Sequence, residues 1–178
     1  MNIEALKFPI GPYVVPDIID QKQINEWISE IELFPKRLAK LTSNISTKEL
    51  NYHYRPGGWM IKQVIHHCAD SHMNAVIRFK LTLTENEPKI RPYYEDRWAL
   101  LPDSLDEDIS ATIQILTGLH KKWGSILRHI KSEDLKREFI HPEHGKRFSL
   151  AETIGNYAWH SNHHLAHIKQ ALTYKGQF

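Results

Sequence analysis

The chain has 178 residues, of which 41% are apolar and 25% charged, and its formal net charge is +2 at pH 7. These values predict one soluble globular domain, residues 1–178, and give no reason to expect nucleic acid or an acidic membrane surface as a partner. Cys68 is the single cysteine, so an intrachain disulfide is excluded and a cytoplasmic location is expected. No stretch stays apolar for the roughly 18 residues that a membrane helix needs, and no secretory signal is expected.

The elements predicted along the chain are mostly long helices. Prolines and glycines near the start predict an extended arm over residues 1–20. Apolar residues then recur with a period near 3.6 in three segments, which predicts helices over 21–42, 59–84 and 105–131.

The region before the last helix has a different pattern. Phe139–His141 and Arg147–Leu150 flank a short turn and predict a small β-hairpin. Ser149 and Glu152 have the spacing of a capping box, which predicts a fourth helix over 150–174. Four long amphipathic helices in one chain indicate an all-α fold, a four-helix bundle.

Histidine is concentrated near the end of the chain, where four of the twelve histidines lie between residues 160 and 167. Each residue of a helix advances by about 100° around the axis. His160 and His164 therefore fall on the edge of the apolar stripe of their helix. His163 and His167 fall farther round and are expected toward solvent or an edge of the bundle.

His67 occupies a similar position on the helix predicted over 59–84, at about 60° from Val64. His66 points away from the apolar stripe and is expected to be exposed. Three polar residues share the His67 side of this helix and are candidate catalytic residues, in contact with substrate or with the ligating histidines: Asp70, Asn74 and Arg78.

Facing helices of a bundle can bring His67, His160 and His164 to one point, which predicts a metal site with open coordination positions. The competing interpretation is that they are hydrogen-bonded core residues, because one HxxxH pair arises by chance on the order of once in so histidine-rich a chain. His72 and His167 are weaker candidates for a pocket, and Cys68 is expected to be an inert core thiol. The remaining histidines are assigned to solvent or loops: His53, His120, His129, His141 and His144.

Several blocks, in order along nearly the whole chain, resemble the YfiT members of the DinB superfamily. The blocks are Phe8–Gly11, Tyr54–Trp59, Val64–Leu83, Arg91–Tyr93, Phe139–Pro142 and Trp159–Ile168. The resemblance implies a four-helix bundle, a homodimer, and one divalent metal per chain held by three histidines. Carried over residue by residue, these ligands fall on His67, His160 and His164.

The resemblance also implies a metal-dependent hydrolase of a small molecule, while other members of the superfamily are transferases that use low-molecular-weight thiols such as bacillithiol. An open zinc site permits both activities, because it acidifies bound water and also binds thiolate. Ser161 follows the first histidine where an HExxH enzyme has its glutamate base, which favours thiol transfer.

Hydrolysis is the first hypothesis, thiol transfer the second, and a non-catalytic metal-binding or ligand-binding protein the third. Zinc is the expected metal, with nickel and manganese as alternatives. We also expect at least one of three arginines to bind a carboxylate or phosphate of the substrate: Arg55, Arg78 or Arg91.

Overall fold

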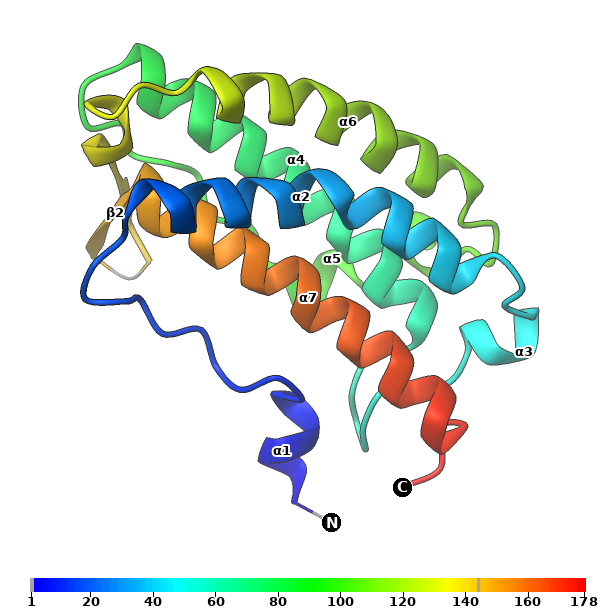
Figure 1. Ribbon diagram of the computed structural model, residues 1–178. Coiled ribbons are helices and arrows are strands. Elements are labelled where there is room, and N and C mark those ends of the chain that lie inside the picture. Colours follow the sequence, from blue (N-terminus) through cyan, green and yellow to red (C-terminus); the bar gives the residue numbers. More distant parts are fainter. Residues whose placement is uncertain (1, 144) are drawn as a thin grey trace.

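Four long helices form a bundle in the computed structural model, which describes residues 2–143 and 145–178 (Figure 1). They are α2 (Gln21–Thr42), α4 (Ile61–Thr84), α6 (Ser110–His129) and α7 (Leu150–Tyr174). Helix α2 packs against α6 and α7, and α4 packs against the same two helices. The helices α2 and α4, consecutive among the long ones, therefore occupy opposite corners of the bundle. No helix of the described residues is long and apolar enough to cross a membrane.

Short elements connect these helices. They are α1 (Ile3–Lys7), α3 (Thr47–Leu50), α5 (Glu95–Trp98), the 3-10 helices η1 (Pro102–Leu105) and η2 (Asp134–Lys136), and the strands β1 (Glu138–His141) and β2 (Lys146–Ser149). The strands pair antiparallel, with Glu138 opposite Ser149 and His141 opposite Lys146. The predicted bundle and the hairpin before the last helix are thus confirmed.

Two helices are shorter than predicted. Helix α4 begins at Ile61 because the Gln63 side chain accepts a hydrogen bond from the Met60 N–H at 2.9 Å, which caps the helix there. Helix α6 covers 110–129 instead of 105–131. The Asp108 carboxylate accepts from the Ser110 N–H at 2.9 Å just before its start, and Ile130 is extended at its end. The residues before α6 form η1 and a connection.

The N-terminal arm is not entirely extended, as the sequence predicted, because it begins with α1. The Asn2 side chain caps this helix by accepting from the Glu4 N–H at 3.0 Å. Leu6 is buried, and its carbonyl accepts a hydrogen bond from Gln170 Nε2 of α7 at 2.9 Å. Farther along, Trp159 Nε1 donates to the Gly11 carbonyl at 3.0 Å. These contacts hold the arm against α7.

The core consists of two apolar clusters with a histidine layer between them. One cluster surrounds Phe34 and Ile65, and the other surrounds Phe79 and Trp123. Between the two clusters, α4 contributes His72, α6 contributes His120 and α7 contributes His160. The first two are almost completely buried, with exposures of 0% and 2%. The bundle is therefore polar at its centre and apolar on either side.

Candidate metal centre

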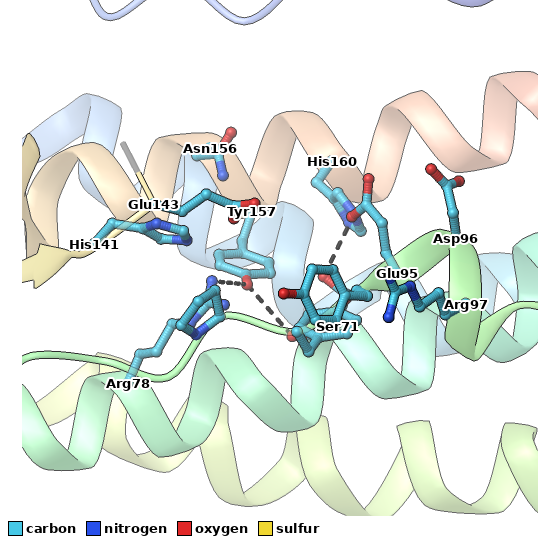
Figure 2. Close-up of a pocket in the computed structure, with 13 residues that line it drawn as sticks. Ser71, Arg78, Glu95, Asp96, Arg97, His141, Glu143, Asn156, Tyr157 and His160 are labelled. Carbon is cyan, nitrogen blue, oxygen red and sulfur yellow. Dashed lines mark hydrogen bonds between the residues drawn. The ribbon is translucent and has the colours of Figure 1, made fainter. Parts of the chain in front are cut away.

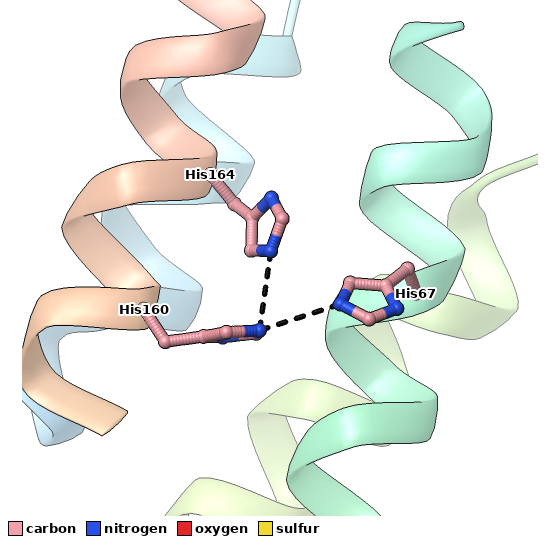
Figure 3. Close-up of side chains that lie close together, drawn as sticks. All are labelled: His67, His160 and His164. Carbon is pink, nitrogen blue, oxygen red and sulfur yellow. Dashed lines mark hydrogen bonds between the residues drawn. The ribbon is translucent and has the colours of Figure 1, made fainter. Parts of the chain in front are cut away.

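Three histidines from two helices converge at this central layer (Figure 3). His160 and His164 lie one turn apart on α7, and their Nε2 atoms are 3.1 Å apart. His67 approaches from α4, with its Nε2 atom 3.3 Å from Nε2 of His160. One ring nitrogen from each histidine lies within 4.8 Å of the others, and among the described residues this is the one such group of metal-ligand side chains. The structure thus brings together the three residues that helical phase selected.

All three imidazoles are held in the neutral form. Burial, reinforced by the nearby His163, lowers the pKa of His67 to about 4. Burial and the neighbouring imidazoles also hold the pKa values of His160 and His164 well below the usual range. Neutral imidazole is the form that ligates a metal.

The donor set fits a divalent cation. A neutral imidazole carries a single ring proton, so three converging nitrogens cannot all be satisfied by hydrogen bonds among themselves. A cation between them removes the repulsion of their lone pairs. His67 and His164 are buried, with exposures of 5% and 7%, and the indole ring of Trp59 lies 4.8 Å from the His67 ring. His160 is half-buried and gives the group its access to solvent.

Two cavities meet at His160. One, of about 530 Å³, is lined by Ser71, Arg78, Tyr157 and residues of α5. Figure 2 shows Arg78 and His160 on opposite sides of Tyr157. The other cavity, of about 470 Å³, is lined by all three converging histidines together with the aromatic rings of the N-terminal arm and its surroundings. A small molecule can therefore reach the histidines through either cavity.

Glu95 and Asp96 of α5 line both cavities, and sequence reasoning missed them. Partial desolvation, followed by the negative charges of Asp96 and Glu143, raises the pKa of Glu95, while Arg78 opposes this shift. No spacing in the sequence relates Glu95 to the histidines. Its proximity to His160 depends on how the α4–α6 connection folds back over the bundle.

The three candidate catalytic residues on α4 lie in different places. Arg78 lines the cavity of His160, its Nη1 donates to Tyr157 Oη at 3.5 Å, and its buried Nε has no hydrogen-bond partner among the described residues. Asn74 lines a neighbouring cavity, and its Nδ2 donates to the Asp70 carbonyl at 2.9 Å. Asp70 lines neither cavity of His160. Burial and the charge of Asp103 raise the pKa of Asp70 to about 6.

The expectation that His66 is exposed is wrong, because its exposure is 7%. Its Nδ1 lies 2.6 Å from Thr112 Oγ1 of α6, and its Nε2 lies 3.1 Å from the Asp106 carbonyl. The segment between η1 and α6 thus covers a helix face that the phase of α4 alone assigns to solvent.

His163 and His167 are also buried, with exposures of 6% and 2%, contrary to their expected positions toward solvent or an edge. The ring of His163 stacks on Trp159 at 4.3 Å between centroids, and that of His167 stacks on Tyr54 at 3.8 Å. The arm covers this side of α7, since the Lys7 carbonyl lies 3.1 Å from His167 Nε2.

Among the remaining histidines, the assignment of His120 to solvent is wrong, since its exposure is 2%. His53 and His129 are exposed, as expected, and His141 is half-buried. His144 lies outside the described residues. Cys68 is completely buried in the apolar core, as predicted.

Comparisons with known proteins agree with this fold. The DinB superfamily model matches residues 30–168. A Bacillus cereus (strain 03BB102) protein named "Putative metal-dependent hydrolase" is 48% identical over 164 residues, which cover 92% of this chain and 93% of that protein. A Bacillus mycoides (strain KBAB4) protein with the same description is 47% identical over 167 residues, covering 93% of this chain and 95% of that protein.

A solved structure is similar over almost the whole chain. It is YfiT from Bacillus subtilis, described as "a probable metal-dependent hydrolase with an unusual four-helix bundle topology". The TM-score is 0.93 at 41% sequence identity, and the match covers 97% of this chain and 98% of that one. The class of protein is therefore a four-helix bundle with a histidine cluster in its core. The chain belongs to the DinB superfamily.

Proposed function

We propose that this protein is a metal-dependent hydrolase of a small molecule, with one divalent cation held by His67, His160 and His164. The observation that carries the proposal is the convergence of three neutral imidazoles at the junction of two cavities, beside a carboxylate, Glu95, that lines both. The names of the relatives support it. Zinc is the first choice because imidazole nitrogen suits it, with nickel and manganese as alternatives.

A divalent cation in such a site supplies Lewis acidity, which polarises the bond to be cleaved and makes a nearby water more acidic. Glu95 and Asp96 both line the two cavities, and we assign Glu95 as the group that accepts the proton of the attacking water at a carboxylate oxygen. Its raised pKa brings it closer to neutral pH, where a general base is most effective. The protonated Glu95 can then return this proton to the leaving group.

Arg78 is the best placed of the three arginines to bind the substrate. Arg55 and Arg78 each line a cavity of His160. Arg78 is preferred because its buried Nε has no hydrogen-bond partner among the described residues, so it can still donate. A guanidinium in this position favours a substrate that carries a carboxylate or phosphate group apart from the bond to be cleaved. Tyr157, between Arg78 and His160, supplies an aromatic wall for the part that connects them.

Thiol transfer remains the second candidate, because a thiolate is a soft ligand that the same three histidines and a zinc ion would accept. The sequence favoured it because no carboxylate follows His160 in the chain. Glu95 supplies that carboxylate from α5, a different segment. Hydrolysis requires a base to accept a proton from the attacking water, whereas a thiol loses its proton when it binds the metal. The presence of Glu95 therefore favours hydrolysis.

The experiment compares zinc-reconstituted and zinc-free protein on three kinds of substrate: esters, amides, and a thiol with an electrophile. Each ester or amide is tested with and without a distal acidic group. We expect zinc-dependent hydrolysis without thiol, inhibition by added thiol, and a loss of about 10² to 10⁴ in kcat for Glu95→Gln at unchanged zinc content. Turnover that requires both thiol and electrophile would establish the transferase instead. No turnover at full zinc occupancy would favour the non-catalytic binding protein.

A further inference from the structure

Two of the three converging histidines are held from behind by other buried histidines. The Nδ1 atom of His160, on the opposite side of the ring from the converging Nε2, lies 3.2 Å from Nε2 of His72. The Nδ1 atom of His164 likewise lies 3.3 Å from Nδ1 of His167. His72 and His167 have exposures of 0% and 2%, so solvent does not compete for these hydrogen bonds.

The hydrogen-bond chain behind His160 continues across the whole bundle. Nδ1 of His72 lies 2.8 Å from Nε2 of His120, and Nδ1 of His120 lies 2.7 Å from the carbonyl oxygen of Ile31. The chain therefore takes one residue from each of α7, α4, α6 and α2, and it runs through the polar layer between the two apolar clusters. The chain behind His164 is shorter, because Nε2 of His167 lies 3.1 Å from the Lys7 carbonyl.

Both chains end on backbone carbonyls that helical hydrogen bonds leave free. The partner of the Ile31 carbonyl in α2 would be the N–H of residue 35, and that residue is Pro35, which has none. Lys7 is the last residue of α1, where carbonyls lack an intrahelical donor. The Gly11 N–H, the next candidate, donates instead to the Phe8 carbonyl at 2.9 Å.

A carbonyl oxygen can only accept, and this fixes the direction of every hydrogen bond in both chains. His120 must donate from Nδ1, so the Nε2 of this neutral ring is an acceptor. It receives the proton of His72 Nδ1, and Nε2 of His72 in turn receives the proton of His160 Nδ1. The only ring nitrogen of His160 left without a proton is Nε2, the atom that converges on the other two histidines.

The second chain leads to the same result. His167 must donate from Nε2 to the Lys7 carbonyl, so its Nδ1 accepts the proton of His164 Nδ1. Nε2 of His164 is then unprotonated and faces Nε2 of His160 at 3.1 Å. Two unconnected hydrogen-bond chains, anchored on different segments, thus present a lone pair at the same point.

We propose that His72, His120 and His167 are positioning residues, forming two histidine relays that fix the ring orientation and tautomer of His160 and His164 so that each presents the lone pair of Nε2 to the cation. The inference rests on the metal site of the proposed function, but not on hydrolysis as the reaction. Groups that orient metal ligands typically contribute about 10-fold to 100-fold to metal affinity.

The test compares His72→Phe with His66→Phe. Both residues are buried on α4, but the hydrogen bonds of His66 lead to Thr112 and Asp106 and not to a converging histidine. Zinc affinity is measured by competition with a chelating dye, and the tautomer of His160 in zinc-free protein by ¹⁵N NMR of the imidazoles. We expect His72→Phe to weaken zinc binding about 10-fold to 100-fold and to shift His160 toward the form with Nε2 protonated. His66→Phe should change neither.

Two further variants separate a relay from simple packing. His120→Leu should shift the His160 tautomer in the same direction, and it should add little in a His72→Phe background, because the chain is already broken there. His72→Gln provides a second test if His72→Phe does not fold. The amide oxygen of the glutamine can accept from His160 Nδ1, so this variant should retain most of the zinc affinity.

Folded His72→Phe and His120→Leu proteins with the zinc affinity and His160 tautomer of the original chain would overturn the inference. So would a His72→Gln protein as weak in zinc binding as His72→Phe. The readouts involve no turnover, so a protein that binds zinc normally but hydrolyses no substrate would contradict the proposed function alone.

Discussion

The Nε2 atoms of His160 and His164 lie 3.1 Å apart on successive turns of α7, too close for both rings to carry a positive charge. Their surroundings are equally unfavourable to protonation. Burial lowers the pKa values of His67 and His163 to about 4, and that of His167 to about 3. The region is therefore a group of coupled bases that folding holds neutral.

The first prediction is that zinc-free protein loses stability as the pH falls below about 6.5. These histidines have lower pKa values in the folded than in the unfolded chain, so below the unfolded value the unfolded chain binds more protons. The free energy of unfolding should fall by up to about 1.4 kcal/mol per pH unit for each buried histidine involved, down to about pH 4. Urea unfolding between pH 8 and pH 4 measures this. A constant unfolding free energy between pH 7 and pH 5 would contradict this prediction. Bound zinc should move the loss of stability to lower pH.

The second prediction concerns the ligands. His67→Ala, His160→Ala and His164→Ala should each reduce bound zinc well below one ion per chain, because two remaining imidazoles hold the ion weakly. His66→Ala and His163→Ala should keep their zinc, although both sites are buried and both variants are expected to be less stable. Elemental analysis of dialysed protein measures the content. Loss of zinc from His163→Ala with retention by His160→Ala would show that the assignment of ligands is wrong.

Helical phase was sufficient to find the three converging histidines, because it depends only on neighbours along one helix and on the direction of the core. The same reasoning failed for His66, His163 and His167. His66 is covered by the η1–α6 connection, and His163 and His167 are covered by the N-terminal arm. The periodicity of a helix does not encode where such short segments dock. His120 was assigned to solvent without an argument from helical phase; it is buried one turn after Leu116, and its Nδ1 lies 2.7 Å from the Ile31 carbonyl of α2.

The limits of the fold prediction have similar causes. The apolar stripes predicted the four-helix bundle and both bounds of α2, and the capping box of Ser149 and Glu152 predicted the start of α7, where the structure has it. The starts of α4 and α6 depend on local side-chain hydrogen bonds, from the Met60 N–H to Gln63 and from the Ser110 N–H to Asp108, that lie inside the predicted helices. Glu95 belongs to a four-residue helix in a connection, so its place beside His160 follows only from the tertiary fold.

The third prediction assigns substrate binding to Arg78. Arg78→Lys should raise KM for substrates with a distal carboxylate or phosphate by about 10-fold to 100-fold, because lysine cannot reproduce a two-pronged hydrogen bond. The same change at Arg91, which is exposed and lines the neighbouring cavity, is the matched control. KM for substrates without the acidic group should not change in either variant. Unaltered Michaelis constants in lysine variants of Arg55, Arg78 and Arg91 alike would exclude this role for all three.

The last prediction concerns Pro35, whose missing N–H leaves the Ile31 carbonyl to His120. Pro35→Ala removes a residue that costs a helix interior about 3 kcal/mol and adds an N–H that competes for the Ile31 oxygen. We expect the protein to unfold at equal or higher urea concentration, yet to bind zinc more weakly and to show a mixed His160 tautomer. A substitution at the exposed neighbour, Lys36→Ala, should leave both zinc affinity and tautomer unchanged. A purely structural role for Pro35 predicts that stability and zinc affinity change in the same direction, so opposite changes in one variant would distinguish the relay from it.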